Sequence, residues 1–288
     1  VTATTMDSNS EYYSVFAWWI RRSEKSSTIH SKLSLFFHSI FIVNYPESVG
    51  SAFGYDYFSL LDFYATGSIR ILAKKISRLN AMHYYLDNRL NTVVAPNENY
   101  AREFLELFTI QKGSQDGVGS YTNYTEHDVQ QAARVLTGFT NITESQRMSY
   151  IDTECNIPLG RKVIANHDTG NKTFSAKFGN QTIVGATTAA GMDVELDSFI
   201  DMVFNQTETA KSYARRLYRY FVRRTIDTEV ETDIITPLAN NLLNNNYDLT
   251  STTKMLLKSV HFYDEDDTTV GDEIIGSKIK SPLELLLM

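Results

Sequence analysis

A histidine and an aspartate stand side by side near the middle of the chain, at His167 and Asp168. A neutral imidazole beside a carboxylate can ligate a metal or act as a general base. Adjacent side chains can face one site if they lie on a turn, and the nearby Gly170 indicates a turn. His167 and Asp168 are therefore candidate catalytic residues and candidate ligands of a divalent cation. The structural alternative is an Asx turn at Asp168 and a bond from His167 to a carbonyl group.

Two glutamates, Glu103 and Glu106, lie three residues apart in the segment 97–109, which is predicted to be a helix. Neighbouring carboxylates can hold a cation or shift each other's pKa, so both are candidate catalytic residues. Asn99 and Arg102 are predicted to lie on the same polar face of this helix as the two glutamates. The alternative is a solvated face on which an Arg102–Glu106 pair contributes roughly 0.2–0.5 kcal/mol. The opposite face is predicted to be buried and comprises Tyr100, Ala101, Phe104, Leu105, Leu107 and Phe108.

A further histidine, His38, is a candidate metal ligand within the apolar segment 28–43. That segment predicts a helix buried on several sides. Zinc needs three or four protein donors, and a lone histidine on a buried helix is usually a hydrogen-bonded core residue. The core interpretation is therefore favoured for His38.

Arginines follow one face of the predicted helix 207–224, at Arg215, Arg216, Arg219 and Arg223. Such a stripe can bind a phosphate or the carboxylate of a polysaccharide. Since the chain is acidic overall, with a formal charge of −7, solvation or pairing with acidic neighbours is the favoured interpretation.

Helical periodicity predicts the elements that position these residues. Asn97 can cap one helix, and Thr125 with Asp128 forms a loose capping box for another that ends near Gly138. Between residues 140 and 191 the periodicity is absent, and short strands are predicted at 163–165, 172–174 and 182–184. The remaining predicted helices are 11–22, 28–43, 53–64, 68–79, 194–204, 207–224, 232–245 and 251–262.

We therefore predict a mainly α, multi-helix single domain over residues 1–288, with a loop and β-hairpin excursion around 140–191. The 288 residues contain 42% hydrophobic residues, enough for a sizeable core. The negative charge makes nucleic acid an unexpected partner. No apolar run is long enough for a membrane-spanning segment. The chain starts at Val1 and stops within the apolar run 283–288, so we expect that both ends are cut from a longer polypeptide.

Two segments, 97–109 and 124–139, resemble the signature of a large bacterial family known as domain of unknown function 1800. Further similarity lies at 81–88 and 279–284. The resemblance implies a largely helical fold and an exported protein, located outside the cell or at its surface. It leaves activity, substrate and cofactor open.

The resemblance also implies binding residues, because the family motif fixes polar residues on the outer face of one helix. That face is then expected to bond another segment or to line a pocket. The residues concerned are Asn97, Glu98, Asn99 and Arg102. The family typically has Phe-Trp-His-Asn-His-Phe at 36–41, whereas this chain has Phe37, Ser39 and Ile40 in place of tryptophan, asparagine and the second histidine.

The missing second histidine and the lack of a complete catalytic set favour a non-catalytic, exported component of a cell-surface or extracellular assembly. A protein partner or self-association is expected, since aromatic residues are frequent at interfaces. The alternative is a metal-assisted hydrolase or lyase that acts on an extracellular polymer. In that alternative Glu98, Glu103, Glu106, His167 and Asp168 converge on a cation, and the candidate binding residue Arg134 binds an anionic group of the substrate.

Overall fold

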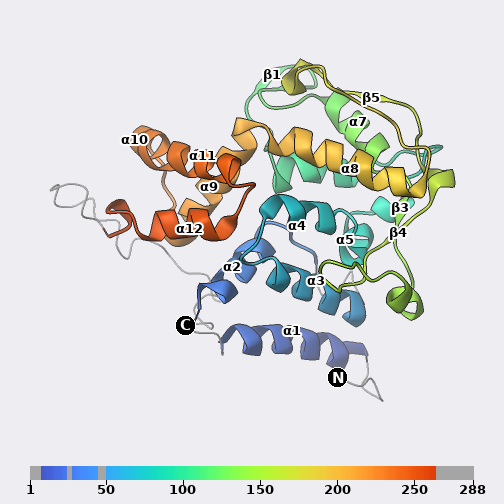
Figure 1. Cartoon of the computed structure of the whole chain (residues 1–288), viewed down its shortest axis with the longest axis horizontal. Helices are drawn as coiled ribbons and strands as arrows, with labels where there is room; N and C mark the ends of the chain where they lie inside the picture. The colour runs from blue at the N-terminus through green and yellow to red at the C-terminus, as the bar shows by residue number, and fades with distance from the viewer. Residues whose placement is uncertain (1–7, 25–27, 45–49, 264–288) are drawn as a thin grey trace.

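The computed structural model describes residues 8–24, 28–44 and 50–263, and within them the chain is mainly helical, as predicted (Figure 1). The expectations for the chain ends, the motif at 279–284 included, lie outside the described residues. The helices are α1 (Ser8–Glu24), α2 (Ile29–His38), α3 (Ser51–Phe63), α4 (Ile69–Ile76), α5 (Asn80–Tyr85), α6 (Asn99–Glu103), α7 (Glu126–Val135), α8 (Ala189–Phe204), α9 (Thr207–Phe221), α10 (Thr228–Val230), α11 (Thr236–Asn244) and α12 (Leu249–Leu257). In the described part, none of them is long and apolar enough to cross a membrane.

Three short antiparallel strand pairs accompany the helices. The pairs are β1 (Gln115–Gly117) with β2 (Ser120–Tyr121), β3 (Phe139–Thr140) with β4 (Arg161–Lys162), and β5 (Lys172–Thr173) with β6 (Thr182–Ile183). The predicted pairing around residues 172 and 182 is confirmed, with Lys172 opposite Ile183. The strand predicted at 163–165 is wrong, because residues 164–166 form a 3-10 turn in which His167 N–H donates to the carbonyl of Ile164.

The helices form three neighbouring groups (Figure 1). Helices α1 and α2 pack on α3, while α8 packs on α4 and α7. Helix α9 packs on α11, and α11 also contacts α12, so that α9–α12 make one end of the molecule. One hydrophobic core cluster extends from Trp19 to Leu256. The segment that connects α7 to α8 is the predicted loop and hairpin excursion, and it runs past both helices.

Two capping predictions are confirmed. Thr125 accepts a hydrogen bond from the backbone of Asp128, whose carboxylate accepts the Thr125 N–H at 2.8 Å. The Asn97 side chain accepts the N–H of Asn99 at 2.9 Å, so it satisfies a donor at the start of α6. These local bonds fix where the two signature helices begin.

Helix α2 ends five residues earlier than predicted. It stops at His38, and the Ser39 hydroxyl donates to the carbonyl of Phe36 at 2.6 Å. Such a side-chain bond competes with continued helix. As a result Ile40 and Ile42 belong to an irregular segment and not to a helix face.

A π turn, Phe104–Phe108, follows α6 directly. The wider turn rotates the side chains after it relative to an ideal helix. Phe104 and Phe108 are buried as predicted, but Leu107 is 54% exposed, so its predicted burial is wrong. The departure from regular helical spacing turns Leu107 out of the core.

Candidate functional site

The polar residues at the start of α6 are bonded to other parts of the chain. The Asn97 N–H donates to the side chain of Asn91 at 2.9 Å, and the Asn99 amide donates to the carbonyl of Leu86 at 3.1 Å. The side chain of Asn99 therefore bonds another segment, as expected of this face, whereas Asn97 does so through its backbone N–H. Whether either asparagine binds a partner stays a prediction.

Arg102 connects α6 with the start of α7. Its guanidinium donates to both carboxylate oxygens of Glu126, at 2.9 and 2.7 Å, and to Glu98 at 3.1 Å. The bond from Arg102 lowers the pKa of Glu126 below its ordinary value. Glu98 and Arg102, both candidate binding residues, thus share an ion-pair network with Glu126.

The two candidate glutamates of this segment have different surroundings. Glu106 accepts a hydrogen bond from the Tyr124 hydroxyl at 3.1 Å and lies 3.5 Å from the Lys112 ammonium group. Glu103 has no ion-pair partner among the described residues, and burial, followed by the charge of Glu106, raises its pKa. The structure brings the two carboxylates close enough to influence each other but gives them separate contacts.

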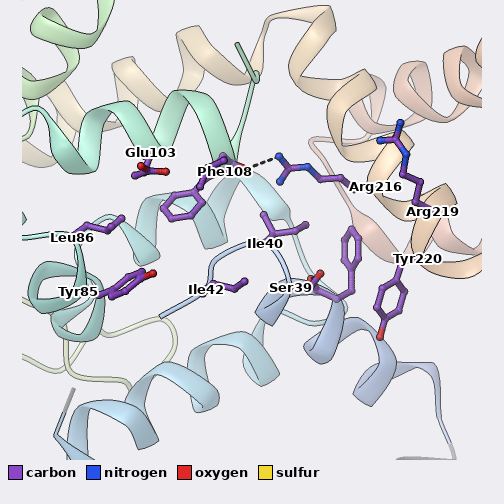
Figure 2. Close-up of a pocket in the computed structure, with 12 residues that line it drawn as sticks. Ser39, Ile40, Ile42, Tyr85, Leu86, Glu103, Phe108, Arg216, Arg219 and Tyr220 are labelled. Atoms are coloured by element: carbon purple, nitrogen blue, oxygen red, sulfur yellow. Dashed lines mark hydrogen bonds between the residues drawn. The ribbon is translucent and has the colours of Figure 1, made fainter. Parts of the chain in front are cut away.

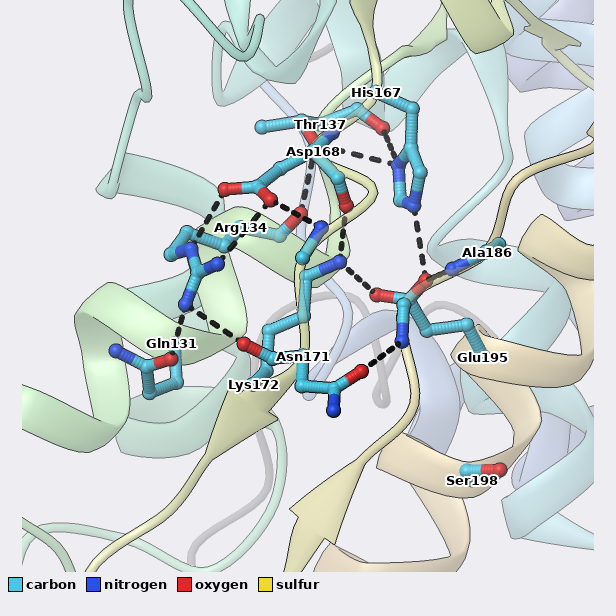
Figure 3. A network of polar contacts seen from close by, with 12 residues as sticks. Gln131, Arg134, Thr137, His167, Asp168, Asn171, Lys172, Ala186, Glu195 and Ser198 are labelled. Carbon is cyan, nitrogen blue, oxygen red and sulfur yellow. Dashed lines mark hydrogen bonds and ion pairs between the residues drawn. The ribbon is translucent and has the colours of Figure 1, made fainter.

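His167 lies in a closed polar network beneath the loop excursion (Figure 3). Its Nδ1 is 2.7 Å from the carbonyl of Thr137 and its Nε2 is 2.9 Å from the Glu195 carboxylate. The carbonyl oxygen can only accept, so the His167 Nδ1 donates to it, while Nε2 faces the carboxylate. Both ring nitrogens are used, which leaves neither free to ligate a metal or to accept a proton from a substrate.

Glu195 of α8 is the centre of this network. Its second oxygen lies 2.6 Å from the Lys172 ammonium group, and its first also accepts the Ala186 N–H at 2.6 Å. Lys172 donates further to the carbonyl of Asp168. The side chains of His167, Lys172 and Glu195 are 0–1% exposed, so the ion pair between Lys172 and Glu195 is shielded from water.

Gly138 permits the close approach of the His167 segment. It follows α7 with φ of 76°, a conformation in which residues other than glycine are strained. A Cβ atom there would lie 2.7 Å from the carbonyl oxygen of Val163 and 3.1 Å from the His167 backbone nitrogen. The glycine of the signature segment therefore serves the packing of the loop on α7.

Asp168 and Arg134 form the outer part of the same network (Figure 3). The Arg134 guanidinium donates to the two Asp168 oxygens, at 2.7 and 3.2 Å, and this contact lowers the pKa of Asp168. Asp168 also accepts the Gly170 N–H at 2.9 Å, which is the Asx turn considered from the sequence. Arg134 is thus bonded to Asp168, and its predicted binding of an anionic substrate group stays a prediction.

His38 faces an aromatic part of the core. Its Nδ1 lies 2.7 Å from the Tyr57 hydroxyl, which in turn donates to the carbonyl of Phe41. Burial lowers the pKa of His38 to about 4. Over the residues that the structure describes, no three His, Cys, Asp or Glu side chains are grouped as ligands for a metal ion.

A cavity of about 720 Å³ lies between the segment 36–42, the end of α5, the segment 103–108 and α9 (Figure 2). Glu103 is on its wall, as are Ile40 and Ser39, the positions at which the family typically has histidine and asparagine. His38, His167 and Asp168 are not among its lining residues. The lining comprises Phe36, Ser39, Ile40, Ile42, Tyr85, Leu86, Glu103, Leu107, Phe108, Arg216, Arg219 and Tyr220.

The four arginines along α9 fall into two sets with different surroundings. Arg215 pairs with Glu208 and Glu231, and Arg223 pairs with Asp227, as the ion-paired interpretation predicted. The other two, Arg216 and Arg219, reach the cavity, and within the described ranges no carboxylate forms an ion pair with them. Of the two predicted alternatives, solvation fits the exposed Arg219, whereas Arg216 is partly buried.

The sequence interpretation missed Lys172 and Glu195. A signal for Glu195 was present, because it lies three residues after Met192 and four before Phe199, on the buried face of α8. A carboxylate at such a position needs a buried cation. That cation is Lys172, which reaches Glu195 only through the tertiary fold, so the spacing of residues around Glu195 does not predict it.

A family model described as "Protein of unknown function (DUF1800)" matches residues 3–288, nearly the whole chain. The resemblance read from the signature segments is thereby confirmed. No curated protein and no solved structure matches the chain.

Proposed function

Because the chain belongs to the DUF1800 family, whose description records no activity, we propose its function from the chemistry of its own site. It acts as a non-catalytic, exported component of a cell-surface or extracellular assembly and holds part of a partner in the Glu103 cavity. The proposed location outside the cell rests on the family resemblance.

The composition of the cavity wall is the observation that carries this proposal. The wall is apolar at Ile40, where relatives typically have a histidine, and Glu103 is its single carboxylate. The hydroxyl of Ser39 is engaged by the Phe36 carbonyl, and no histidine lines the wall to activate it. Such a wall suits the burial of a partner group and offers no paired acid and base.

The alternative, a metal-assisted hydrolase or lyase, requires that the candidate residues share one site. Glu106 bonds Tyr124, His167 bonds Glu195 and Thr137, and Asp168 bonds Arg134, while Glu103 faces the cavity. These separate contacts favour the binding function over the catalytic one.

The proposal is tested on protein isolated from its native source without denaturation. Mass photometry and sedimentation are expected to show a stoichiometric partner or self-association, and surface labelling of intact cells is expected to reach the protein. The substitution Leu107→Glu places a charge at the exposed cavity rim and should release the partner. Val94→Glu, at a position 90% exposed and outside the cavity lining, is the matched control.

A monodisperse monomer without bound protein in native material would overturn the proposal. Metal analysis of the same material tests the alternative. A stoichiometric divalent cation that is lost on Glu103→Gln would favour the hydrolase or lyase.

A further inference from the structure

We infer that the cavity binds the carboxyl-terminal end of an apolar peptide. The terminal carboxylate lies at Arg216 and Arg219, the apolar side chains lie against the wall, and a peptide N–H donates to Glu103. This inference rests on the proposed function and names the chemistry of the partner segment.

Arg216 and Arg219 provide the site for the carboxylate. They are three residues apart on α9, so their side chains leave one face of the helix. Arg216 is partly buried, donates to the carbonyl of Leu107, and stacks 5.8 Å from the ring centre of Tyr213. These contacts hold the guanidinium in place before a ligand arrives, and burial lowers its pKa. A fixed, partly desolvated cation without a counter-ion favours an entering anion.

The wall between the charged groups is apolar. Phe108 and Ile40 lie between Glu103 and the two arginines in Figure 2, and Leu86, Ile42 and Leu107 extend the same surface. Leu107 and Ile42 are 54% and 46% exposed, so a ligand that covers them removes apolar surface from water. A volume of about 720 Å³ is within the range of ligand pockets and accommodates two or three side chains.

Glu103 supplies an acceptor on the other side of the cavity. Among the described residues it lacks an ion-pair partner, and its raised pKa reflects the partial loss of water around the carboxylate. An N–H donor from a ligand would compensate for that loss.

Three kinds of ligand can be compared on these contacts. Inorganic phosphate would match the arginines but not the apolar wall. A fatty acid would match the arginines and the wall but leave Glu103 without a donor. A peptide end matches all three features, because it joins a carboxylate, apolar side chains and backbone N–H groups.

The test uses isothermal titration calorimetry with the full 288-residue chain and four probes: N-acetyl-trileucine, its carboxyl-terminal amide, octanoate and inorganic phosphate. We expect one-to-one binding of N-acetyl-trileucine. The amide should bind about tenfold more weakly, since it lacks the charge-assisted bonds to the arginines. Octanoate and phosphate should also bind more weakly than the peptide acid.

Matched variants locate the site. Arg219→Gln should weaken N-acetyl-trileucine about tenfold. Lys211→Gln removes the same charge from the same helix outside the cavity lining and should leave the affinity unchanged. Arg216→Lys keeps the charge but loses the planar fork, so it should weaken the acid more than the amide. Glu103→Gln should weaken the peptide severalfold and leave octanoate unaffected.

Equal affinity for the acid and the amide, or no heat of binding up to about 5 mM peptide, would overturn the inference. Tighter binding of octanoate or phosphate would overturn it as well and would assign the cavity to a lipid-like or phosphorylated ligand. These outcomes are independent of the native-material experiment, in which a partner that survives Leu107→Glu would count against the proposed function itself.

Discussion

The network around Glu195 and the cavity around Glu103 both contain carboxylates and basic side chains, but they use them differently. In the network each charge faces an opposite charge or a carbonyl oxygen at hydrogen-bond distance, and the side chains are 0–1% exposed. In the cavity Glu103 and Arg216 are separated by apolar side chains and reach no counter-ion within the described part of the chain.

This contrast identifies the residues whose atoms are available for binding. The adjacent histidine and aspartate have the types expected of a catalytic pair, yet their atoms are engaged by the protein itself. The cavity residues form no recognisable catalytic pattern, yet they border a space that a ligand can enter. Availability of the side-chain atoms, and not residue type, separates a structural site from a binding site.

The largest predicted effect breaks the network. Glu195→Gln leaves the Lys172 ammonium group buried without its anion, so the free energy of unfolding should fall by about 3–5 kcal/mol. Urea denaturation followed by circular dichroism at pH 7 measures the change.

The control is Asp197→Asn on the same helix. Asp197 pairs with Lys74 at the surface and is 45% exposed, so its loss should cost less than about 1 kcal/mol. Similar losses for the two variants would contradict the view that the network is closed and charge-matched.

Two histidines in the core, His83 and His38, contact a carbonyl or hydroxyl oxygen and no carboxylate of the described residues. Burial lowers the pKa of His83 and of His38 to about 4. Each is neutral when folded and takes up a proton on unfolding below its ordinary pKa of about 6.5. Their contribution to stability is therefore complete above pH 6.5 and is lost as the pH falls toward 4, at up to about 1.4 kcal/mol per pH unit for each histidine.

Urea midpoints between pH 7 and 4.5 measure this slope. His83→Gln should reduce the slope, whatever its effect on stability at pH 7, because one titrating group is removed. A stability that is constant between pH 7 and 5 would show that these imidazoles are not kept neutral by burial.

The smallest predicted effect compares two carboxylates of the signature region. The pKa of Glu103 is raised, so its contribution to stability is present below pH 4.5 and is lost as the pH rises through the folded value. The pKa of Glu126 is lowered by Arg102, so its contribution is present above pH 4.5 and is lost on acidification.

At pH 7, Glu103→Gln should therefore raise the free energy of unfolding by up to about 0.5 kcal/mol, whereas Glu126→Gln should lower it by a similar amount. Thermal unfolding of the two variants side by side measures the sign. If both substitutions lowered the free energy of unfolding, Glu103 would have a counter-ion, which would contradict the description of the cavity.

The sequence predicted the features that depend on neighbouring residues. The capping box of Thr125 with Asp128, the cap at Asn97 and the strand pair at 172 and 182 all arise from contacts within a few residues, and all are confirmed. The helical class follows from periodicity over long segments.

The remaining features depend on tertiary contacts. Glu195 contacts Lys172, 23 residues away in the sequence, and His167, 28 residues away. Patterns within a few residues cannot predict contacts over such separations. Arg216 and Glu103 share a cavity only because α9 lies beside the π turn. Regular helical spacing predicts that Leu107 is in the core, but the residues of the π turn follow a different spacing.

Because of the π turn, the number of residues in the signature segment 97–109 affects the direction of its side chains, independently of which residues they are. A chain one residue shorter between 104 and 108 could keep every neighbouring amino acid and still close the helix in the ordinary way. Leu107 would then face inward, and the surface it lends to the cavity would vanish. The number of residues in this segment, as well as their identity, therefore decides which side chains line the cavity.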